Sequence, residues 1–322
     1  MMECIQKTHQ RNLHCALIFS LTFSVATTDL LGQSPPITDV AFAPNGKEVV
    51  ASSQAGLQVY NWPELKLQKT IPISFPNIHV LQFSPDGQQL AVGGGNPAED
   101  GVVEILSWPN FQSLMKLIGH DDSVIALTWT SDQQLVSASL DRVMLSWDIQ
   151  SKKATTTYRG HSRGISAVCK LRDETLVSAA RDLSVRVWNR KSAELLRSLN
   201  QHSGPIHSIA VCPAESTIPI VATAAADRTV RFWQPTIGRM MRYIRLESEP
   251  LDVAWISDVF LLASCVNGQV CLINTKNVTL IEQVPGIDGW AYTLAIHPND
   301  GSFAVAGSNG VIRRGELALP SQ

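Results

Sequence analysis

The chain has 322 residues and a formal net charge of −2, and only 17% of its residues are charged. A balance this close to neutral argues against a surface that attracts nucleic acid or anionic membranes, so we expect no nucleic acid partner. The 20 glycines and 17 prolines are typical of a chain that turns often.

The first stretch, residues 1–26, has the pattern of a targeting segment. Lys7 and Arg11 precede an apolar run, residues 15–26, which is too short to cross a bilayer core of about 30 Å but fits the core of a signal peptide. Ser24-Val25-Ala26 provides a cleavage site with small residues. We predict a signal peptide and export to the periplasm or the extracellular space, with no integral membrane span. The alternative is an uncleaved apolar arm on a cytoplasmic protein.

Residues 27–36 are expected to form a strand followed by a Pro-rich joint, and residues 37–322 a series of short strands. The alternating run from Ile37 to Phe42 ends in the turn Ala43-Pro44-Asn45-Gly46, and similar phrases begin near Val80 and Leu294. Counting such strands gives seven units. The predicted inner strands begin near Ile37, His79, Val124, Ile165, Ile206, Leu251 and Tyr292.

The last unit reaches Leu317 without an outer strand of its own. Residues 27–32 lie just ahead of the first inner strand, where the missing strand would be needed. We therefore predict that the N-terminal strand closes the ring and removes an exposed sheet edge.

The most informative stretch, residues 119–234, repeats the same polar residues three times. Three histidines open the units at intervals of 41 residues, and three tryptophans close them at intervals of 41 and 45 residues, a period typical of propeller blades. Each unit has an Asp six residues before its Trp, and a Ser or Thr four residues before that Asp. The sets are His120, Ser137, Asp141 and Trp147; His161, Ser178, Asp182 and Trp188; His202, Thr223, Asp227 and Trp233.

These sets resemble the WD-repeat β-propeller family, in which such a tetrad forms a hydrogen-bonded network inside the blade. The resemblance implies an all-β fold, a seven-bladed propeller of four-stranded antiparallel blades. A buried Asp needs several hydrogen bonds, and a His ring, a hydroxyl and an indole N–H can donate them. Because each His has an Asp in its own blade, we assign the tetrads a structural role and expect no metal site. Blades one, two, six and seven lack the set and are expected to depend on apolar packing and turns.

Six cysteines occur without any C-x-x-C spacing, which leaves zinc ribbons, thioredoxin-type redox sites and c-type haem unsupported. Cys265 and Cys271 flank one tight turn, so a disulfide between them is an alternative to the buried thiols that we expect. Gly160-His161-Ser162-Arg163-Gly164 matches the G-x-S-x-G pattern of serine hydrolases, but its flanks are strands of a repeat rather than a strand and a helix. We therefore assign no catalytic residue and no cofactor.

Four residues are candidates for binding a partner. Arg142 and Arg228 follow a tetrad Asp, Arg181 precedes one, and Trp290 lies in the comparable loop of the last blade. The family resemblance implies that residues beside this Asp lie on the narrow face where partners dock. Arg and Trp are also enriched at interface hot spots. A solvated Arg or a Trp packed on its own blade is the alternative.

The sequence thus predicts a monomeric, non-catalytic platform for a protein or peptide partner. The alternative is an exported propeller enzyme, or an enzyme subunit, that binds a small ligand in the central channel. We expect the inner strands to offer mainly apolar and small residues, such as Val40, Phe42, Leu127 and Trp129, and this expectation favours the platform.

Overall fold

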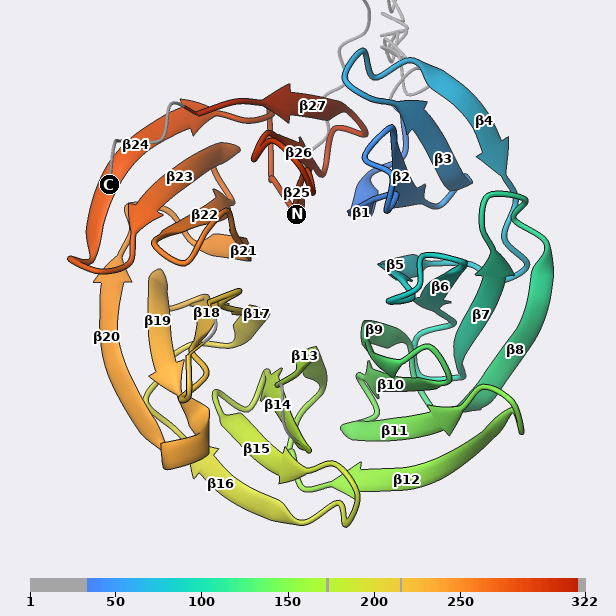
Figure 1. Ribbon diagram of the computed structural model, residues 1–322, viewed down its shortest axis with the longest axis horizontal. Coiled ribbons are helices and arrows are strands. Elements are labelled where there is room, and N and C mark those ends of the chain that lie inside the picture. The colour runs from blue at the N-terminus through green and yellow to red at the C-terminus, as the bar shows by residue number, and fades with distance from the viewer. Residues whose placement is uncertain (1–33, 172–173, 215, 318–322) are drawn as a thin grey trace, which may run out of the picture. The chain divides into compact units, whose positions relative to one another are not determined.

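Seven antiparallel sheets surround a central axis (Figure 1), as the sequence predicts. The computed structural model describes residues 34–171, 174–214 and 216–317. The chain divides into two units, residues 1–33 and 34–322, and only the second contains described residues. Six sheets have four strands, and the seventh has three within the described ranges. The predicted leader and the predicted closing strand, residues 27–32, lie outside them.

The strands are numbered from the centre outward within each blade. The inner strands are β1 (Ile37–Phe42), β5 (Ile78–Phe83), β9 (Val124–Ser131), β13 (Ile165–Lys170), β17 (Ile206–Val211), β21 (Pro250–Trp255) and β25 (Thr293–Ile296). The second strands are β2 (Glu48–Ser53), β6 (Gln89–Gly94), β10 (Gln134–Ser139), β14 (Thr175–Ala180), β18 (Val221–Ala225), β22 (Phe260–Cys265) and β26 (Phe303–Ala306).

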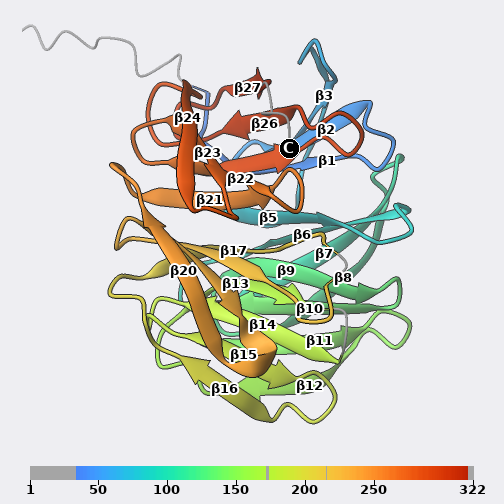
Figure 2. The same ribbon diagram turned by 60° about the vertical axis from the view of Figure 1, so that its left-hand side comes forward.

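The third strands are β3 (Gly56–Asn61), β7 (Gly101–Ser107), β11 (Val143–Asp148), β15 (Val185–Asn189), β19 (Thr229–Gln234), β23 (Gln269–Asn274) and β27 (Ile312–Gly315). The outer strands are β4 (Leu67–Ile71), β8 (Ser113–His120), β12 (Lys153–Arg159), β16 (Leu195–Leu199), β20 (Arg239–Arg245) and β24 (Thr279–Pro285). One 3₁₀ turn, η1 (Pro235–Ile237), links β19 to β20. Seen from the side, β20 and β24 cross the inner strands steeply (Figure 2), as expected from the twist of each sheet.

All seven inner strands begin within one residue of the predicted positions. The alternation of the sequence is interrupted near the start of six of them, where one residue has no partner on the second strand. This β-bulge bends the strand at the centre of the ring. The bulged residues are Thr38, His79, Ile125, Ser166, His207 and Leu251.

The core of the ring lies between blades. Strands β14 and β22 are buried at every position, because their sheets pack against a neighbour on each face. Seven apolar clusters fill the seven junctions; the one between blades two and three includes Val103, Leu117 and Trp129. Outer strands such as β4 are largely exposed. Apolar burial between neighbouring blades therefore stabilises the ring.

Contacts between blades seven and one close the ring within the described residues. The backbone N–H of Ile37 donates to the Gly307 carbonyl at 3.0 Å, and His297 Nε2 donates to the Gly46 carbonyl at 2.9 Å. Gly46 has a φ of +69° in the turn after β1, a conformation that glycine adopts without strain. The described residues include no helix long and apolar enough to span a bilayer.

Candidate functional site

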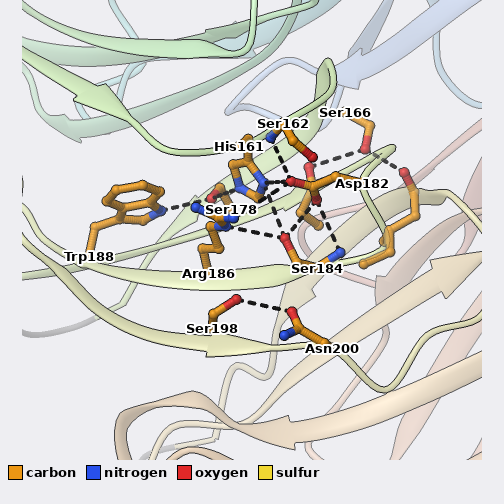
Figure 3. Close-up of polar contacts among 12 residues, drawn as sticks. His161, Ser162, Ser166, Ser178, Asp182, Ser184, Arg186, Trp188, Ser198 and Asn200 are labelled. Atoms are coloured by element: carbon orange, nitrogen blue, oxygen red, sulfur yellow. Dashed lines mark hydrogen bonds and ion pairs between the residues drawn. The ribbon is translucent and has the colours of Figure 1, made fainter.

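The predicted tetrad of blade four forms a chain of hydrogen bonds in the structure (Figure 3). Trp188 Nε1 donates to Ser178 Oγ at 2.8 Å, and Ser178 Oγ lies 2.7 Å from His161 Nε2. His161 Nδ1 lies 2.9 Å from Asp182 Oδ2. The indole and hydroxyl therefore reach the carboxylate only through the imidazole, in series, rather than by bonding to it directly.

Blades three and five repeat this arrangement. In blade three the three distances, from Trp to Asp, are each 2.7 Å. In blade five they are 2.8, 2.7 and 2.8 Å. The structure thus joins the residues of each predicted set: His120, Ser137, Asp141 and Trp147; His161, Ser178, Asp182 and Trp188; His202, Thr223, Asp227 and Trp233.

The protonation states follow from burial and hydrogen bonding. Burial lowers the pKa of His161 and His202, in spite of the carboxylate beside each, so both rings are neutral near pH 7. Burial alone would raise the pKa of Asp182, but hydrogen bonds from His161 and Ser184 outweigh it and hold the pKa far below its ordinary value. Each Asp is therefore an anion. In blades four and five, where the ring is neutral, the Asp accepts from His Nδ1–H, which leaves Nε2 to accept from the Ser or Thr hydroxyl.

Two further residues support the Asp in blades four and five but not in blade three. Ser184 Oγ donates to Asp182 at 2.6 Å, and Arg186 lies 3.9 Å from the same carboxylate. In blade five, Thr229 and Arg231 occupy the same offsets from Asp227. In blade three these offsets hold Val143 and Leu145. The sequence carried this signal as a hydroxyl two residues, and an Arg four residues, after the Asp.

The candidate binding residues lie at the same end of the ring as the tetrad Asp residues. We call this end the tetrad face; it comprises the connections from second to third strands and from outer strands to the next inner strand. Arg142, Arg181 and Arg228 are exposed there, and none makes a side-chain hydrogen bond or ion pair with a described residue. Arg142 and Arg228 have φ values of 72° and 61°, held by the tight turns around the tetrad Asp.

Trp290 lies on the tetrad face in the connection from blade six to blade seven. The residue is 52% exposed, and its backbone N–H donates to Ser308 Oγ at 2.8 Å. The indole meets Tyr292 edge to face, with ring centroids 6.2 Å apart. Tyr292 lines the central channel, so Trp290 stands beside the channel mouth.

The central channel differs from the sequence expectation. Its cavity of about 290 Å³ is lined by ionisable residues from four blades: Asp39, His79, His207 and Asp252. Val40 and Trp129, which we expected on the inner strands as apolar lining, are buried between blades instead, and Phe42 packs in the junction of blades seven and one. Of the four residues named in that expectation, only Leu127 lines the channel.

The two channel carboxylates also correct the expectation that blades without tetrads depend on apolar packing alone. Asp39 accepts from Leu81 N–H in blade two at 2.7 Å and from Thr293 Oγ1 in blade seven at 2.9 Å. Asp252 accepts from Ser208 Oγ in blade five and from the backbone N–H of Leu294 in blade seven. Their polar contacts therefore join neighbouring blades rather than the strands of one blade.

Burial within the ring raises the pKa of both channel carboxylates. The pKa of Asp39 rises to about 7, since burial and the nearby Asp252 outweigh the hydrogen bonds that it accepts. The pKa of Asp252 rises for the same first reason. No lysine or arginine is among the described residues that line the channel.

The metal site, the catalytic serine and the disulfide that the sequence analysis considered can each be compared with the structure. Among the residues that the structure describes, no group of three His, Cys, Asp or Glu side chains could hold a metal ion. Ser162 donates its backbone N–H to Asp182, while both ring nitrogens of His161 are already engaged. Cys169, Cys212, Cys265 and Cys271 are free and buried. The Sγ atoms of Cys265 and Cys271 lie 3.9 Å apart, too far for a disulfide.

Comparisons with known proteins agree with this geometry. The family model of the WD domain, G-beta repeat, matches residues 111–148, 152–189 and 193–234, which hold the three tetrads. WD repeat-containing protein 1 of Xenopus tropicalis is 30% identical over 103 residues, 31% of this chain and 16% of that protein. Guanine nucleotide-binding protein subunit beta-2 of Nicotiana tabacum is 29% identical over 155 residues, 45% of this chain and 40% of that protein.

A third relative, cell division cycle protein cdt2 of Schizosaccharomyces pombe, is 30% identical over 122 residues, 35% of this chain and 25% of that protein. The chain therefore spans 40% or less of the length of each of these three relatives.

Proposed function

The chain is a WD-repeat β-propeller, and from that premise we propose that it is a non-catalytic platform whose tetrad face binds a protein or peptide partner. One observation carries the proposal. Arg142, Arg181, Arg228 and Trp290 are all exposed on that face, and the three arginine side chains make no hydrogen bond or ion pair with a described residue. Unpaired arginines and an exposed Trp are the residue types that anchor interfaces.

The tetrads support a platform in a second way. Their polar side chains are bonded to one another and buried, so they hold the turns of the face without offering a free nucleophile or base. Rigid turns also reduce the entropy lost on binding. The name of the Nicotiana tabacum relative describes a subunit of a guanine nucleotide-binding protein, which fits a role in assembly.

The test is affinity capture from the native source with matched variants. Alanine at Arg181, Arg228 and Trp290 should remove a captured partner. Alanine at Lys153, Lys191 and Arg239, basic residues in or beside the connections from third to outer strands at the opposite end of the ring, should retain it. Equal capture by both triple variants would refute binding through the tetrad face, provided that both variants melt near the wild-type temperature.

The channel supports a second candidate function, the binding of a small ligand. The observation that favours it is the pair of carboxylates, Asp39 and Asp252, in a cavity whose lining holds no lysine or arginine among the described residues. Thermal-shift measurements with cadaverine and with its uncharged diol analogue would test it. A shift with the diamine that disappears in Asp252→Asn supports the ligand site, and no shift with either compound contradicts it.

We also propose that the protein is exported as a monomer after removal of residues 1–26. The proposal is supported by the positive start, the short apolar run and the small-residue cleavage site of that segment. Intact mass of the native protein from fractionated cells should give a start at Thr27 in an exported fraction. A chain that begins at Met1 in the cytoplasm would refute export, and light scattering of the same sample would test the monomer.

A further inference from the structure

Charge is unevenly distributed along the chain. Residues 152–245, from the outer strand of blade three to the end of blade five, contain sixteen lysines and arginines and six aspartates and glutamates, a formal charge of +10. The remaining residues contain ten basic and twenty-two acidic side chains, a formal charge of −12. The near-neutral total therefore hides a strongly basic segment, and a local surplus of this size affects which partners can approach.

Part of this surplus lies on the tetrad face of blades four and five. Arg163 is exposed in the connection before β13, Arg181 in the turn after β14 and Arg228 in the turn after β18. The first two are adjacent, because the backbone N–H of Arg181 donates to the Gly164 carbonyl at 2.9 Å. None of the three side chains has a hydrogen bond or ion pair with a described residue. Arg159 and Arg245, at the ends of β12 and β20, add two more exposed arginines.

The tetrad carboxylates do not cancel these charges. Asp182 already lies 3.9 Å from Arg186, and Asp227 lies 3.5 Å from Arg231. Both carboxylates are buried, with side chains 5% and 3% exposed. Arg186 and Arg231 thus neutralise the two tetrad carboxylates. The exposed arginines of the tetrad face are left without counter-charges.

Blade three differs from its neighbours in this respect. Four residues after Asp141 lies Leu145, where the next two blades have an Arg. The charge of Asp141 is therefore not balanced by such an Arg, and the basic residue nearest to it in sequence is Arg142. Asp121 and Asp122 add negative charge to the same end of the blade. The basic surface therefore ends at blade three on one side.

On its other side the basic surface ends at blade six. Glu247 is exposed in the connection to that blade, and Glu249 is paired with His207 at 2.7 Å. A long polyanion such as nucleic acid would extend from the basic surface onto these acidic flanks. A short acidic segment fits within blades four and five, and like-charge repulsion at both edges would keep it in register.

We propose that the tetrad face of blades four and five, centred on Arg163, Arg181 and Arg228, binds an acidic peptide segment of the partner. The inference rests on the proposed platform function and adds the chemistry of the partner. It also adds Arg163, which sequence reasoning did not select, because that residue precedes the inner strand instead of flanking a tetrad Asp. Each arginine can hold a carboxylate through two parallel N–H···O bonds.

The test uses fluorescence anisotropy with the full chain and a labelled peptide of alternating glutamate and serine. The matched probes are the glutamine–serine peptide and a single-stranded oligonucleotide of the same length. The first variant combines Arg163→Glu with Arg181→Glu. The control combines Lys153→Glu with Lys191→Glu, exposed residues of blades three and four at the opposite end, so both variants change the net charge equally.

The wild type and the control should bind the acidic peptide alike, and the Arg163/Arg181 variant about tenfold or more weakly, a difference of about 1.4 kcal/mol. Binding should weaken as salt rises from about 0.05 to 0.3 M, because exposed charges are screened. Equal binding by the two double variants, binding of the glutamine peptide as tight as the acidic one, or tighter binding of the oligonucleotide would each overturn the proposal.

Failure here is distinguishable from failure of the platform function. A partner that is lost with alanine at Arg181, Arg228 and Trp290, but is captured equally by the Arg163/Arg181 charge reversal and its control, would overturn the acidic segment alone. The platform function would then stand on the capture result.

Discussion

Replacing Asp182 by alanine tests the role of the tetrads most directly. The carboxylate accepts from His161 Nδ1, from the backbone N–H and hydroxyl of Ser184, and from the backbone N–H of Ser162. Ser162 is exposed and can bond to water, whereas His161 and the Ser184 hydroxyl are buried. The variant therefore leaves three donors of buried residues without this acceptor: the His161 Nδ1–H and the N–H and hydroxyl of Ser184.

Each such donor costs about 1–3 kcal/mol, and part of that cost is offset because an anion no longer has to be buried. We expect the free energy of unfolding to fall by about 3 kcal/mol, which lowers the melting temperature by roughly 5 °C for a domain of this size. Scanning calorimetry at neutral pH would measure the change.

Asp148→Ala is the matched control, since Asp148 ends the third strand of blade three and accepts a hydrogen bond from Ser151 N–H on the surface. Its melting temperature should stay near that of the wild type. If Asp182→Ala melted within about 2 °C of this control, the argument that the tetrad anion organises the blade would be refuted.

Three further outcomes follow from the same contacts. Asp141→Ala should lower the melting temperature less than Asp182→Ala, because Asp141 accepts no bond from a hydroxyl and has no Arg four residues later. The pKa of Asp39 is raised to about 7, so the folded state keeps a proton that the unfolded chain loses near pH 4. The contribution of Asp39 to stability therefore falls as pH rises from about 4 to 7. Urea titrations should show a shallower fall in Asp39→Asn, and an unchanged slope would contradict the assignment. Burial raises the pKa of Cys169 to about 12, so this thiol should resist alkylation in the native protein and react after unfolding, as peptide mass spectrometry would show.

The sequence predicted most of the fold because each blade has recognisable local sequence signals. Alternating strands, Asn-Gly and Asp-Gly turns and the regular spacing of His and Trp located all seven inner strands within one residue. The tetrad residues were also visible as a set, since their offsets follow from the hairpin register that brings Ser178 beside Trp188 and His161. The serial order of the hydrogen bonds could not be read from spacing.

The channel lining was missed for a geometrical reason. Strict alternation sends every second residue of a strand to the same face, and on that rule Val40 and Phe42 were expected at the centre. The bulge near the start of β1 leaves Thr38 unpaired and brings both Thr38 and Asp39 to the channel, while Val40 is buried between blades. A bulge depends on how neighbouring strands pair, and a single strand sequence does not reveal it.

Polar contacts divide the ring into two regions. Where a blade has a tetrad, the residue after the bulge is small, as Ala126 and Ala167 are in blades three and four, and the carboxylate lies at the end of the blade. Where the tetrad is missing, in blades one and six, the same position holds Asp39 or Asp252, which accept hydrogen bonds from adjacent blades.

Both solutions place one buried or half-buried carboxylate in a blade and satisfy it with backbone and side-chain donors, as the energetics of a buried anion require. The tetrad and the inner-strand Asp differ in which parts of the ring they connect. A tetrad fixes the turns of its own blade, and so fixes the arginines beside them. An inner-strand Asp instead joins the blade to its neighbours near the point where the ring closes. The proposed binding face and the closure of the ring are therefore supported by different carboxylates, and substitution at one set can test its role with little direct effect on the contacts of the other.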